Sequence, residues 1–556
     1  MKRRTMMGAA AAAAVAPNTL ARGAFAQEAN EKIRKINFYT WPQAALPQAY
    51  QASQLIAQEW RKLGLDIDVK PLQRQAQTAL IWYTRDKWDT TMWRMVGRPE
   101  RSDPDEFVFS LFYSPSADKG YDFVGYKNPE YDKLAQKQRT QIDKEARRKT
   151  IFEAQEMINR DQPYAFLVHP KYPMAFNKKV FKEDTVVTQT GIGIRNIWTF
   201  VGAEPIGAQK DLIINSSEAL NACNPLYIGG AVDSWITDLI WDRLMRIGPD
   251  GQPVPWSAES VDWKDDTTIA IKLRAGMKWH DGKPVTVDDV IFSFTAPAGD
   301  KAPMYKPFVT EISSMEKDGD MGLTMKLKTP NAAFFTASLS KINLIPKHVW
   351  EPVLKGLEGK PENAEQIKEI NRTGSGPFKI VRWQPNEEVV LEAFPDHFKA
   401  PKIARWIMRI VPNAEATLGM LKSGELNFLG FFGGDPEVLV KFAKENPDIV
   451  IKSETDVGFE FVAFNCRRPP FDDPAFRRAL SFAIDRRLMV SAAWQDFAVP
   501  ANSHVSPVLS YWHDPSVDNP KTGLAVAKKI LADAGYRLKG NKLYYPAGKQ
   551  EKLTTE

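Results

Sequence analysis

The residues best suited to bind a charged solute lie in one short stretch, residues 93–105. It reads Trp-Arg-Met-Val-Gly-Arg-Pro-Glu-Arg-Ser-Asp-Pro-Asp, an apolar strand end that runs into a charged, proline-interrupted loop. Loops of this kind often carry binding residues. Glu100 stands among Arg94, Arg98 and Arg101, and a carboxylate flanked by guanidinium groups suits a zwitterion or an anion that also carries an amine. The alternative is a solvated loop in which Glu100 and the arginines pair with one another.

The sequence contains no motif for metal binding or catalysis. Its six histidines form no His-Glu-x-x-His pair, and no cysteine–histidine spacing suits zinc. His280 belongs to a structural turn, so we do not predict it as a metal ligand. Gly374-Ser375-Gly376 has neither the spacing of a phosphate loop nor that of a nucleophile elbow. A Ser-His-Asp site assembles only in space, so a hydrolase stays open, but a binding protein without a cofactor is better supported.

Cys223 and Cys466 are the two cysteines of the chain. In an oxidising compartment they could form a disulfide. Two separate buried thiols are the other possibility, and the sequence does not decide between them.

Helices and strands alternate around the binding stretch. Apolar positions between residues 47 and 63 follow helical spacing, and Gly64 ends that helix. Residues 65–70 alternate between apolar and charged side chains, which predicts a half-buried strand. A helix that feeds a strand is typical of an α/β protein.

A second strand-and-helix unit covers residues 460–486. Residues 460–464 are short, apolar and aromatic, as in a buried strand, and two prolines follow. Asp472 or Asp473 is expected to cap the next helix, with Pro474 in its first turn.

Size and charge describe an ordinary globular chain with an export signal. The chain has 556 residues, 43% hydrophobic and 26% charged. Residues 1–26 combine Arg3-Arg4, a small apolar run and an Ala-Phe-Ala cleavage pattern, which favours twin-arginine export over ordinary secretion and is too short for an anchor. Removing them leaves 70 basic against 68 acidic residues, which gives no support for nucleic-acid binding.

The segment 464–486 carries the pattern F-N-x-x-x-x-P-F-x-D-x-x-x-R-x-A-L-x-x-A-I-D-R. It closely resembles the dipeptide- and oligopeptide-binding proteins of ABC importers, solute-binding protein family 5. Residues 278–290 (K-W-H-D-G-K-P-V-T-V-D-D-V) and 374–378 (G-S-G-P-F) resemble two further signatures of that family. Thr286 and Asp289 form a shortened capping box in the first of these. The resemblance implies an α/β fold of the type II periplasmic binding protein kind, with two large lobes around a ligand cleft and an extra small lobe.

The resemblance also implies a circularly permuted order. Residues 36–200 are similar to the end of the family and residues 211 onward to its beginning, with a Gly/Ala/Pro linker between them. A misordered or engineered sequence is the alternative. The domains expected on this basis are an export signal (1–26), most of the grasping lobe (27–172), a return into the central lobe (173–200), the linker (201–210), central lobe (211–245), extra lobe (246–372), central lobe (373–495) and the rest of the grasping lobe (496–556).

The family pattern implies candidate ligand-binding residues on both sides of the cleft. In that family a carboxylate four residues before the proline of an Asp/Glu-Pro pair holds a peptide's ammonium group. Glu100 stands four residues before Pro104, as Glu instead of Asp. The candidates are Trp93, Arg94, Arg98 and Glu100 on one side and Asn224, Phe459, Phe461 and Asn465 on the other. Plain core packing is the alternative for the two phenylalanines.

The function implied is that of a periplasmic receptor. It would close its lobes around a small peptide or an amino-acid-derived solute and deliver it to an ABC permease of the inner membrane, as a monomer and without nucleic acid. The alternatives are a non-peptide solute (opine, sugar derivative or metal chelate) on the same fold, or a secreted hydrolase.

Overall fold

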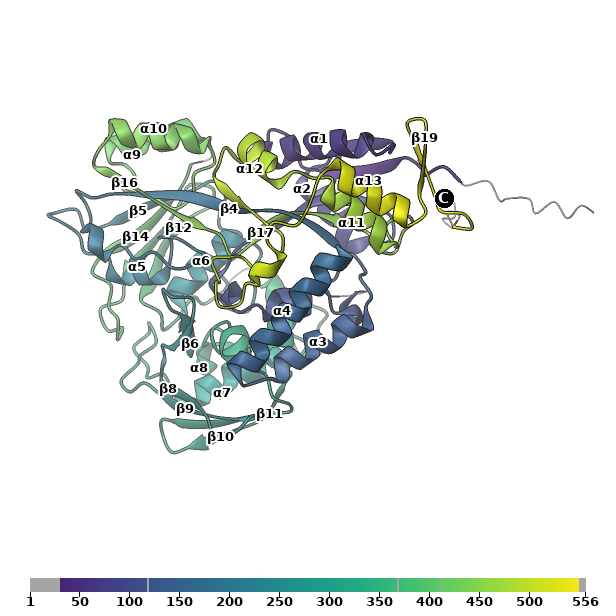
Figure 1. Cartoon of the computed structure of the whole chain (residues 1–556). Helices are drawn as coiled ribbons and strands as arrows, with labels where there is room; N and C mark the ends of the chain where they lie inside the picture. Colours follow the sequence, from purple (N-terminus) through teal and green to yellow (C-terminus); the bar gives the residue numbers. More distant parts are fainter. Residues whose placement is uncertain (1–30, 118–119, 368–369, 412, 550–556) are drawn as a thin grey trace, which may run out of the picture.

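Among the described residues, twelve strands form one large mixed sheet, and a separate smaller sheet lies apart from it (Figure 1). The computed structural model describes residues 31–117, 120–367, 370–411 and 413–549, so the expected export signal lies outside the described residues. Ten strands follow one another in space as β12 (Phe378–Gln384), β13 (Glu388–Ala393), β14 (Arg405–Ile410), β5 (Leu212–Ser216), β15 (Phe428–Leu429), β4 (Tyr164–Asn177), β17 (Phe459–Phe464), β3 (Thr90–Met95), β1 (Ile36–Thr40) and β2 (Ile67–Pro71). The remaining two, β16 (Ile449–Thr455) and β18 (Ala498–Pro500), pair with β4.

Strand β4 joins the two halves of this sheet. Its first part pairs with β17 and β18, and its second part pairs with β15 and β16. In Figure 1 it crosses the molecule as one long strand. We call β17, β18, β3, β1 and β2 the β3 half, and β12 to β16 with β5 the β5 half. The chain crosses between the halves twice, once along β4 and once between β16 and β17.

The β3 half is an α/β/α sandwich. Alternate residues of β17 face opposite cores: Phe459 and Phe461 pack with residues below the sheet in Figure 1, and Val462 and Phe464 pack with those above it. Helices α1 (Pro47–Arg61), α11 (Pro474–Phe482), α12 (Arg486–Trp494) and α13 (Leu524–Asp533) cover one face, and α3 (Pro129–Thr140) and α4 (Lys144–Asp161) cover the other. This alternation is what a strand buried on both faces requires.

The β5 half has two cores of its own. Leu212 and Ile214 of β5 pack on one face, and Ile213 between them packs on the other. Its helices are α5 (Ile197–Gly202), α6 (Ala231–Ile240), α8 (Lys347–Lys355), α9 (Ala414–Ser423) and α10 (Pro436–Glu445).

A smaller lobe, which we call the β9 lobe, is built from residues 244–344. Its antiparallel sheet has the order β10 (Ile312–Asp318), β11 (Gly322–Leu327), β9 (Thr268–Leu273) and β8 (Ala258–Trp263). Helix α7 (Val287–Thr295) packs on it, and residues 244–344 form a separate hydrophobic core.

The short elements complete the chain. Two-stranded ribbons are formed by β6 (Met245–Ile247) with β7 (Pro253–Pro255) and by β19 (Arg537–Lys539) with β20 (Lys542–Tyr544). The remaining helices and helical turns are α2 (Arg74–Thr78), η1 (Ala79–Tyr83), η2 (Pro99–Ser102), η3 (Glu106–Ser110), η4 (Ser114–Ser116), η5 (Glu183–Thr185), η6 (Ala296–Ala298), η7 (Pro303–Phe308), η8 (Phe335–Leu339), η9 (Ala364–Gln366) and η10 (Pro515–Val517).

Several local predictions are confirmed. Asp473 accepts a hydrogen bond from the Ala475 N–H, with Pro474 at the first position of α11. Thr286 and Asp289 form the capping box of α7. Side-chain oxygens at these positions satisfy N–H groups that the first turn of a helix leaves unpaired.

Packing differs from the predicted boundary at residue 495. Strand β17 and helices α11 and α12 share their cores with residues 33–168 and not with the β5 half. The division therefore falls near Asp456, between β16 and β17. The reason is the register of β17, which lies between β3 and β4 and so belongs to the β3 half.

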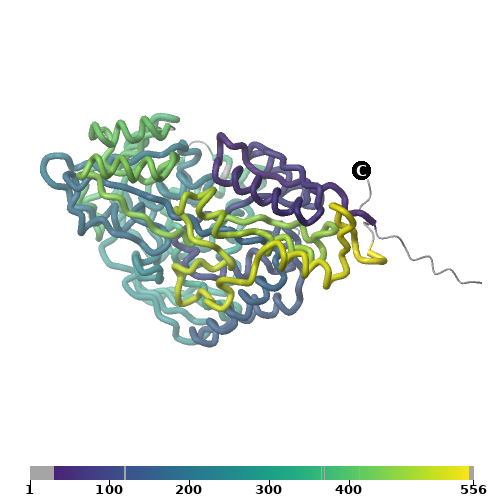
Figure 2. Tube along the Cα trace, turned by 45° about the horizontal axis from the view of Figure 1, so that its top comes forward, coloured from purple at the N-terminus to yellow at the C-terminus, as the bar shows by residue number. Residues whose placement is uncertain are grey.

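The first and last described residues lie side by side. The Ile33 N–H donates to the Leu543 carbonyl at 3.0 Å, and the Tyr545 N–H donates to the Glu31 carbonyl at 2.9 Å. Figure 2 shows the C-terminal segment in yellow beside the N-terminal segment in purple.

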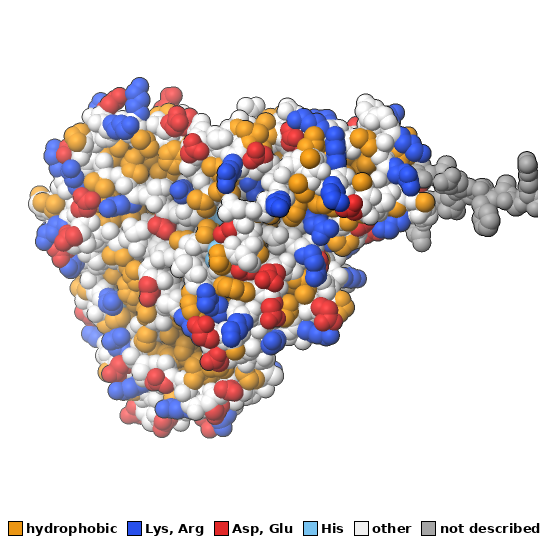
Figure 3. Space-filling model, viewed as in Figure 1, with side chains coloured by type: hydrophobic (Ala, Val, Ile, Leu, Met, Phe, Trp, Pro, Cys, Tyr) orange, Lys and Arg blue, Asp and Glu red, His pale blue; other side chains and the backbone are white. Residues whose placement is uncertain are grey.

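The two cysteines are free thiols. Cys223 is buried in the main core of the β5 half, and Cys466 is half-buried against a core of the β3 half. Within the described ranges, no helix combines the length and apolar character needed to cross a membrane. Acidic and basic side chains are interspersed on the face drawn in Figure 3.

Candidate functional site

Arg94 is positioned by the pairing of β3 with β17. The two strands are antiparallel, and Arg94 lies opposite Glu460 in their register. Cross-strand neighbours project from the same face of a sheet, so both charged side chains turn away from the core that holds Phe459 and Phe461. Burial raises the pKa of Glu460 to about 7, against the opposing effect of Arg94. Its Oε2 atom is buried and has no hydrogen-bond partner among the described residues.

Asp456 lies in the second crossing between the halves. Its Oδ1 atom accepts a hydrogen bond from the Gly458 N–H at 2.6 Å. Burial raises the pKa of Asp456 to about 6, although that hydrogen bond and the neighbouring arginines lower it. The packing is tight here: a Cβ atom on Gly97 would lie 1.7 Å from Asp456 Oδ1, and one on Gly458 would lie 2.0 Å from the Met95 carbonyl. A side chain at Gly458 would force β3 and the crossing apart, and a side chain at Gly97 would displace the Asp456 carboxylate.

Three neighbouring cavities follow residues 94–106. Cavity A, of about 140 Å³, is lined by residues that include Arg94, Gly97, Tyr172, Arg195, Trp235 and Asp456. Cavity B, of about 80 Å³, shares Gly97, Arg195 and Trp235 with cavity A and adds Arg98, Glu100 and Arg243. Cavity C, of about 430 Å³, shares Arg98 and Glu100 with cavity B and extends to Tyr305 and Phe308 of the β9 lobe. The predicted binding stretch therefore lines all three.

Arg195, in the loop between β4 and α5, bounds cavities A and B. Its Nη1 atom donates to the Gly430 carbonyl at 2.8 Å, and its guanidinium lies 3.8 Å from the centre of the Trp235 ring. Burial lowers the pKa of Arg195 to about 10, and the attraction of Asp456 and Tyr172 only partly offsets this. Arg195 is therefore charged at neutral pH but poorly compensated.

Glu100 is held in a buried network of charges. It forms an ion pair with Arg243, which also bonds Asp238 and donates to the Ser340 carbonyl at 2.8 Å. Burial alone would raise the pKa of Glu100, but Arg243, Lys341 and Arg98 outweigh it and the pKa lies below its usual value. The carboxylate is thus ionised and already paired within the protein.

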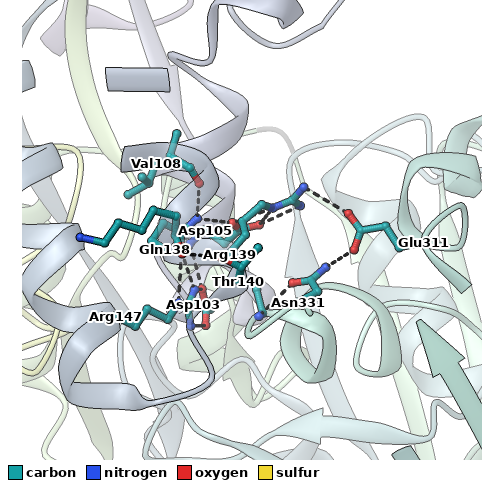
Figure 4. Close-up of polar contacts among 12 residues, drawn as sticks. Asp103, Asp105, Val108, Gln138, Arg139, Thr140, Arg147, Glu311 and Asn331 are labelled. Atoms are coloured by element: carbon teal, nitrogen blue, oxygen red, sulfur yellow. Dashed lines mark hydrogen bonds and ion pairs between the residues drawn. The ribbon is translucent and has the colours of Figure 1, made fainter. Parts of the chain in front are cut away.

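A second polar network borders cavity C and connects α3 to the β9 lobe (Figure 4). Arg139 donates to both carboxylate oxygens of Asp105 and lies 3.4 Å from Glu311. The Ala332 N–H donates to the Arg139 carbonyl at 2.7 Å. Glu311 also accepts a hydrogen bond from Asn331. These contacts fix the β9 lobe against the β3 half.

Of the eight predicted site residues, three line these cavities: Arg94, Arg98 and Glu100. The other five are engaged elsewhere within the protein. Phe459 and Phe461 are 1% and 0% exposed in a core, and Trp93 stacks on Trp41. Asn224 donates to the Ala364 carbonyl, and Asn465 donates to the carbonyls of Arg85 and Trp88. This arrangement does not favour them as solute contacts, so their binding role stays a prediction.

Four residues that sequence reasoning did not single out complete the site: Arg195, Trp235, Arg243 and Asp456. All four come from segments far from residues 94–106 in the chain, and three belong to the β5 half or the crossing. Of these four residues, only Arg195 has a recognisable signal in the sequence, because it is a cation in the glycine-containing loop 191–195. Within the described part of the chain, no group of three or more His, Cys, Asp or Glu side chains is arranged to hold a metal ion.

Comparison with known proteins assigns this arrangement to a family. Residues 252–556 match the model described as bacterial extracellular solute-binding proteins, family 5 Middle. The chain belongs to this family. The oligopeptide-binding protein AppA of Bacillus subtilis is 28% identical over 339 residues, which cover 59% of this chain and 60% of that protein. The heme-binding protein A of Haemophilus influenzae is 26% identical over 335 residues, which cover 56% of this chain and 59% of that protein.

Among solved structures, the periplasmic oligopeptide-binding protein of an oligopeptide ABC transporter from Thermotoga maritima is similar with a TM-score of 0.51. The two are 25% identical, and the match covers 63% of this chain and 67% of the other. The predicted fold class, a type II periplasmic binding protein with an additional small lobe, is thereby confirmed. The chain spans about 60% of the length of the curated relatives named above.

Proposed function

We propose that this family 5 protein is the solute-binding receptor of an ABC importer. It takes up a small peptide or an amino-acid-derived solute between the β3 and β5 halves and hands it to a membrane permease. The observation that carries the proposal is the position of cavities A and B. Cavity A lies beside the two crossings that join the halves, cavity B adjoins cavity A, and the predicted binding stretch lines both. A solute held there contacts both halves at once, which is how a receptor couples binding to closure.

The proposal includes four further points: periplasmic location after twin-arginine export, a monomeric state, the absence of nucleic-acid partners, and a receptor role without catalysis. Support for the location comes from the family description and from the paired arginines at residues 3–4. The near balance of 70 basic and 68 acidic residues after residue 26 supports the absence of nucleic-acid partners.

We also propose that the chain order is circularly permuted. Strands β1 to β3 come from the N-terminal part of the chain and complete the sheet beside β17, and residues 31–33 pair with residues 543–545. Ends that lie together are the geometric requirement for such a rearrangement.

Native mass spectrometry of the purified full chain tests the receptor role. A copurified solute should appear as a stoichiometric mass increment that disappears on denaturation. Incubation with candidate peptides should then give saturable binding and no loss of peptide. Turnover of the peptide would identify a hydrolase and overturn the proposal.

A non-peptide solute is the second candidate. The names of the relatives include a heme-binding protein as well as peptide-binding proteins. One feature of this chain favours a solute other than a free peptide: Glu100, the predicted ammonium contact, is already paired with Arg243.

A further inference from the structure

The two smaller cavities carry an excess of fixed positive charge. Together, cavities A and B are lined by six arginines: Arg74, Arg94, Arg98, Arg195, Arg243 and Arg246. They are lined by four carboxylates: Glu100, Glu218, Asp238 and Asp456. No lysine or histidine of the described residues lines either cavity. A guanidinium binds a carboxylate or phosphate through a planar, two-pronged contact that an ammonium group cannot make.

Arg195 leaves most of its hydrogen-bonding capacity unused. It stacks on Trp235 and donates to one main-chain carbonyl, and it forms no ion pair with any carboxylate of the described ranges. A half-buried cation without a direct counter-charge is costly for the folded protein. An anion placed in cavity A would supply that counter-charge.

Arg94 faces the same cavity from the other half of the molecule. It lies across the β3–β17 pair from Glu460 and forms no hydrogen bond or ion pair with another residue in the part of the chain that the structure describes. Arg94 and Arg195 thus bring donors to cavity A from the β3 half and the β5 half. An acid bound between them would be shared by both halves.

Glu100, the carboxylate predicted to bind an amine, is already paired within the protein. Arg243 pairs with Glu100 inside the protein, and Lys341 and Arg98 add positive charge around it. An ammonium group that approached Glu100 would have to displace the buried guanidinium of Arg243, leaving that charge unpaired. Breaking a buried pair in this way costs several kcal/mol.

We propose that cavities A and B select a solute with an acid group, which Arg195 and Arg94 bind, and that Glu100, already paired with Arg243, does not anchor a free amine. This inference rests on the proposed receptor function and narrows the solute to anions such as carboxylates whose amine is absent or substituted. The aromatic ring of Trp235 and the nearby Tyr172 and Phe431 suit an apolar or planar body attached to that acid.

Cavity C differs from cavities A and B in the charge of its lining. Its lining has three cations, Arg98, Arg139 and Lys341, against five carboxylates, Glu100, Asp103, Asp105, Glu106 and Glu311. Arg139 of this lining is already paired with Asp105 and Glu311 in the network of Figure 4. Cavity C therefore lacks the excess of positive charge that cavities A and B carry, and its carboxylates are largely paired within the protein.

Three probes of one shape test the inference on the purified full chain: benzoate, benzamide and benzylamine. Each is titrated at constant ionic strength and followed by calorimetry and by the shift in melting temperature. Benzoate should bind at least about ten-fold more tightly than the neutral amide, because the charged hydrogen bonds distinguish them. Benzylamine should bind no better than benzamide. The comparison needs no variant and so does not depend on any variant folding.

Matched variants locate the effect. Arg195→Gln and Arg94→Gln should each weaken benzoate binding about ten-fold while leaving benzamide binding unchanged. Arg537→Gln makes the same chemical change on the exposed strand β19 and should leave benzoate binding as it is. Circular dichroism confirms that each variant is folded, and Arg195→Lys, which keeps the charge without the planar fork, should recover only part of the affinity.

Equal responses to benzoate and benzamide, including no response to either, would overturn the acid preference. So would tighter binding of benzylamine, above all if Glu100→Gln removed it. The receptor function fails on different results, namely turnover of a solute or the absence of any copurified solute. The two proposals can therefore fail separately.

Discussion

Glu460 offers the sharpest test of the electrostatics described above. It is 6% exposed on β17, and burial raises its pKa from 4.5 to about 7. Such a carboxyl holds its proton about 3 kcal/mol more tightly in the folded protein than in the unfolded chain. At low pH both states are protonated at this residue. Between pH 4.5 and about 7 only the unfolded state ionises, so the folded state loses stability as pH rises. Above that range the loss is complete.

The change Glu460→Gln removes this titration and keeps the shape of the side chain. At about pH 8 the variant should be more stable than the wild type by up to about 3 kcal/mol, and at about pH 4.5 the two should be nearly equal. For a unit of about 200 residues this corresponds to several degrees in melting temperature. Differential scanning calorimetry of both proteins across this pH range measures the difference.

Asp122 also has a raised pKa in this range, but it titrates in both proteins and cancels in the comparison, whereas the charge of Asp456 helps to raise the pKa of Glu460 and is part of the measured difference. Glu358→Gln, at an exposed position, serves as the matched control and should give two parallel profiles. Parallel profiles for Glu460→Gln as well would refute the reasoning, because they would mean that Glu460 ionises as easily in the folded protein as in water.

Two further predictions concern the contacts between parts of the molecule. Arg139→Gln should lower stability by about 3 kcal/mol, because it leaves the buried Asp105 without its guanidinium. Glu311→Gln removes only the longer, partly exposed contact and should change stability by less than about 1 kcal/mol, and equal losses in urea melts would contradict this ranking. A chain rejoined from residue 549 to residue 31 by a short Gly/Ser linker, and opened in the exposed segment 207–210, should fold with an unchanged melting temperature, because residues 31–33 and 543–545 already pair. Loss of a cooperative thermal transition would count against the permuted order.

Local features of the fold could be predicted from the sequence because their causes are local. Asp473 with Pro474 predicts the start of α11, and Thr286 with Asp289 predicts the start of α7, because helix caps depend on residues only a few positions apart. The full length of strand β4 is hidden in the sequence because Pro170 and Pro173 suggest breaks. The strand continues to Asn177 because β16 and β18 pair along that part.

The candidate site likewise contains residues that could be predicted from the sequence and residues that could not. Residues 94, 98 and 100 could be predicted because a charged loop after a strand is visible in the sequence. Arg243 could not, because its pairing with Glu100 joins positions 143 residues apart. Trp235 and Asp456 acquire their places in cavity A only when the two halves of the sheet meet. For Phe459 and Phe461 the sequence leaves two interpretations open, because aromatic residues on a strand suit a core as well as a cleft, and the structure places both in a core.

Strand β4 has a mechanical consequence. Its strand pairing extends from β17 and β18 in one half to β15 and β16 in the other, with one register shift opposite Glu460 and Phe461. Any motion that brings the halves together must bend β4. Bending the strand stores elastic energy. The elastic work of bending is then part of the free energy of binding any solute that closes the cleft. Substitutions along β4 that stiffen or relax it will change affinity without touching the solute.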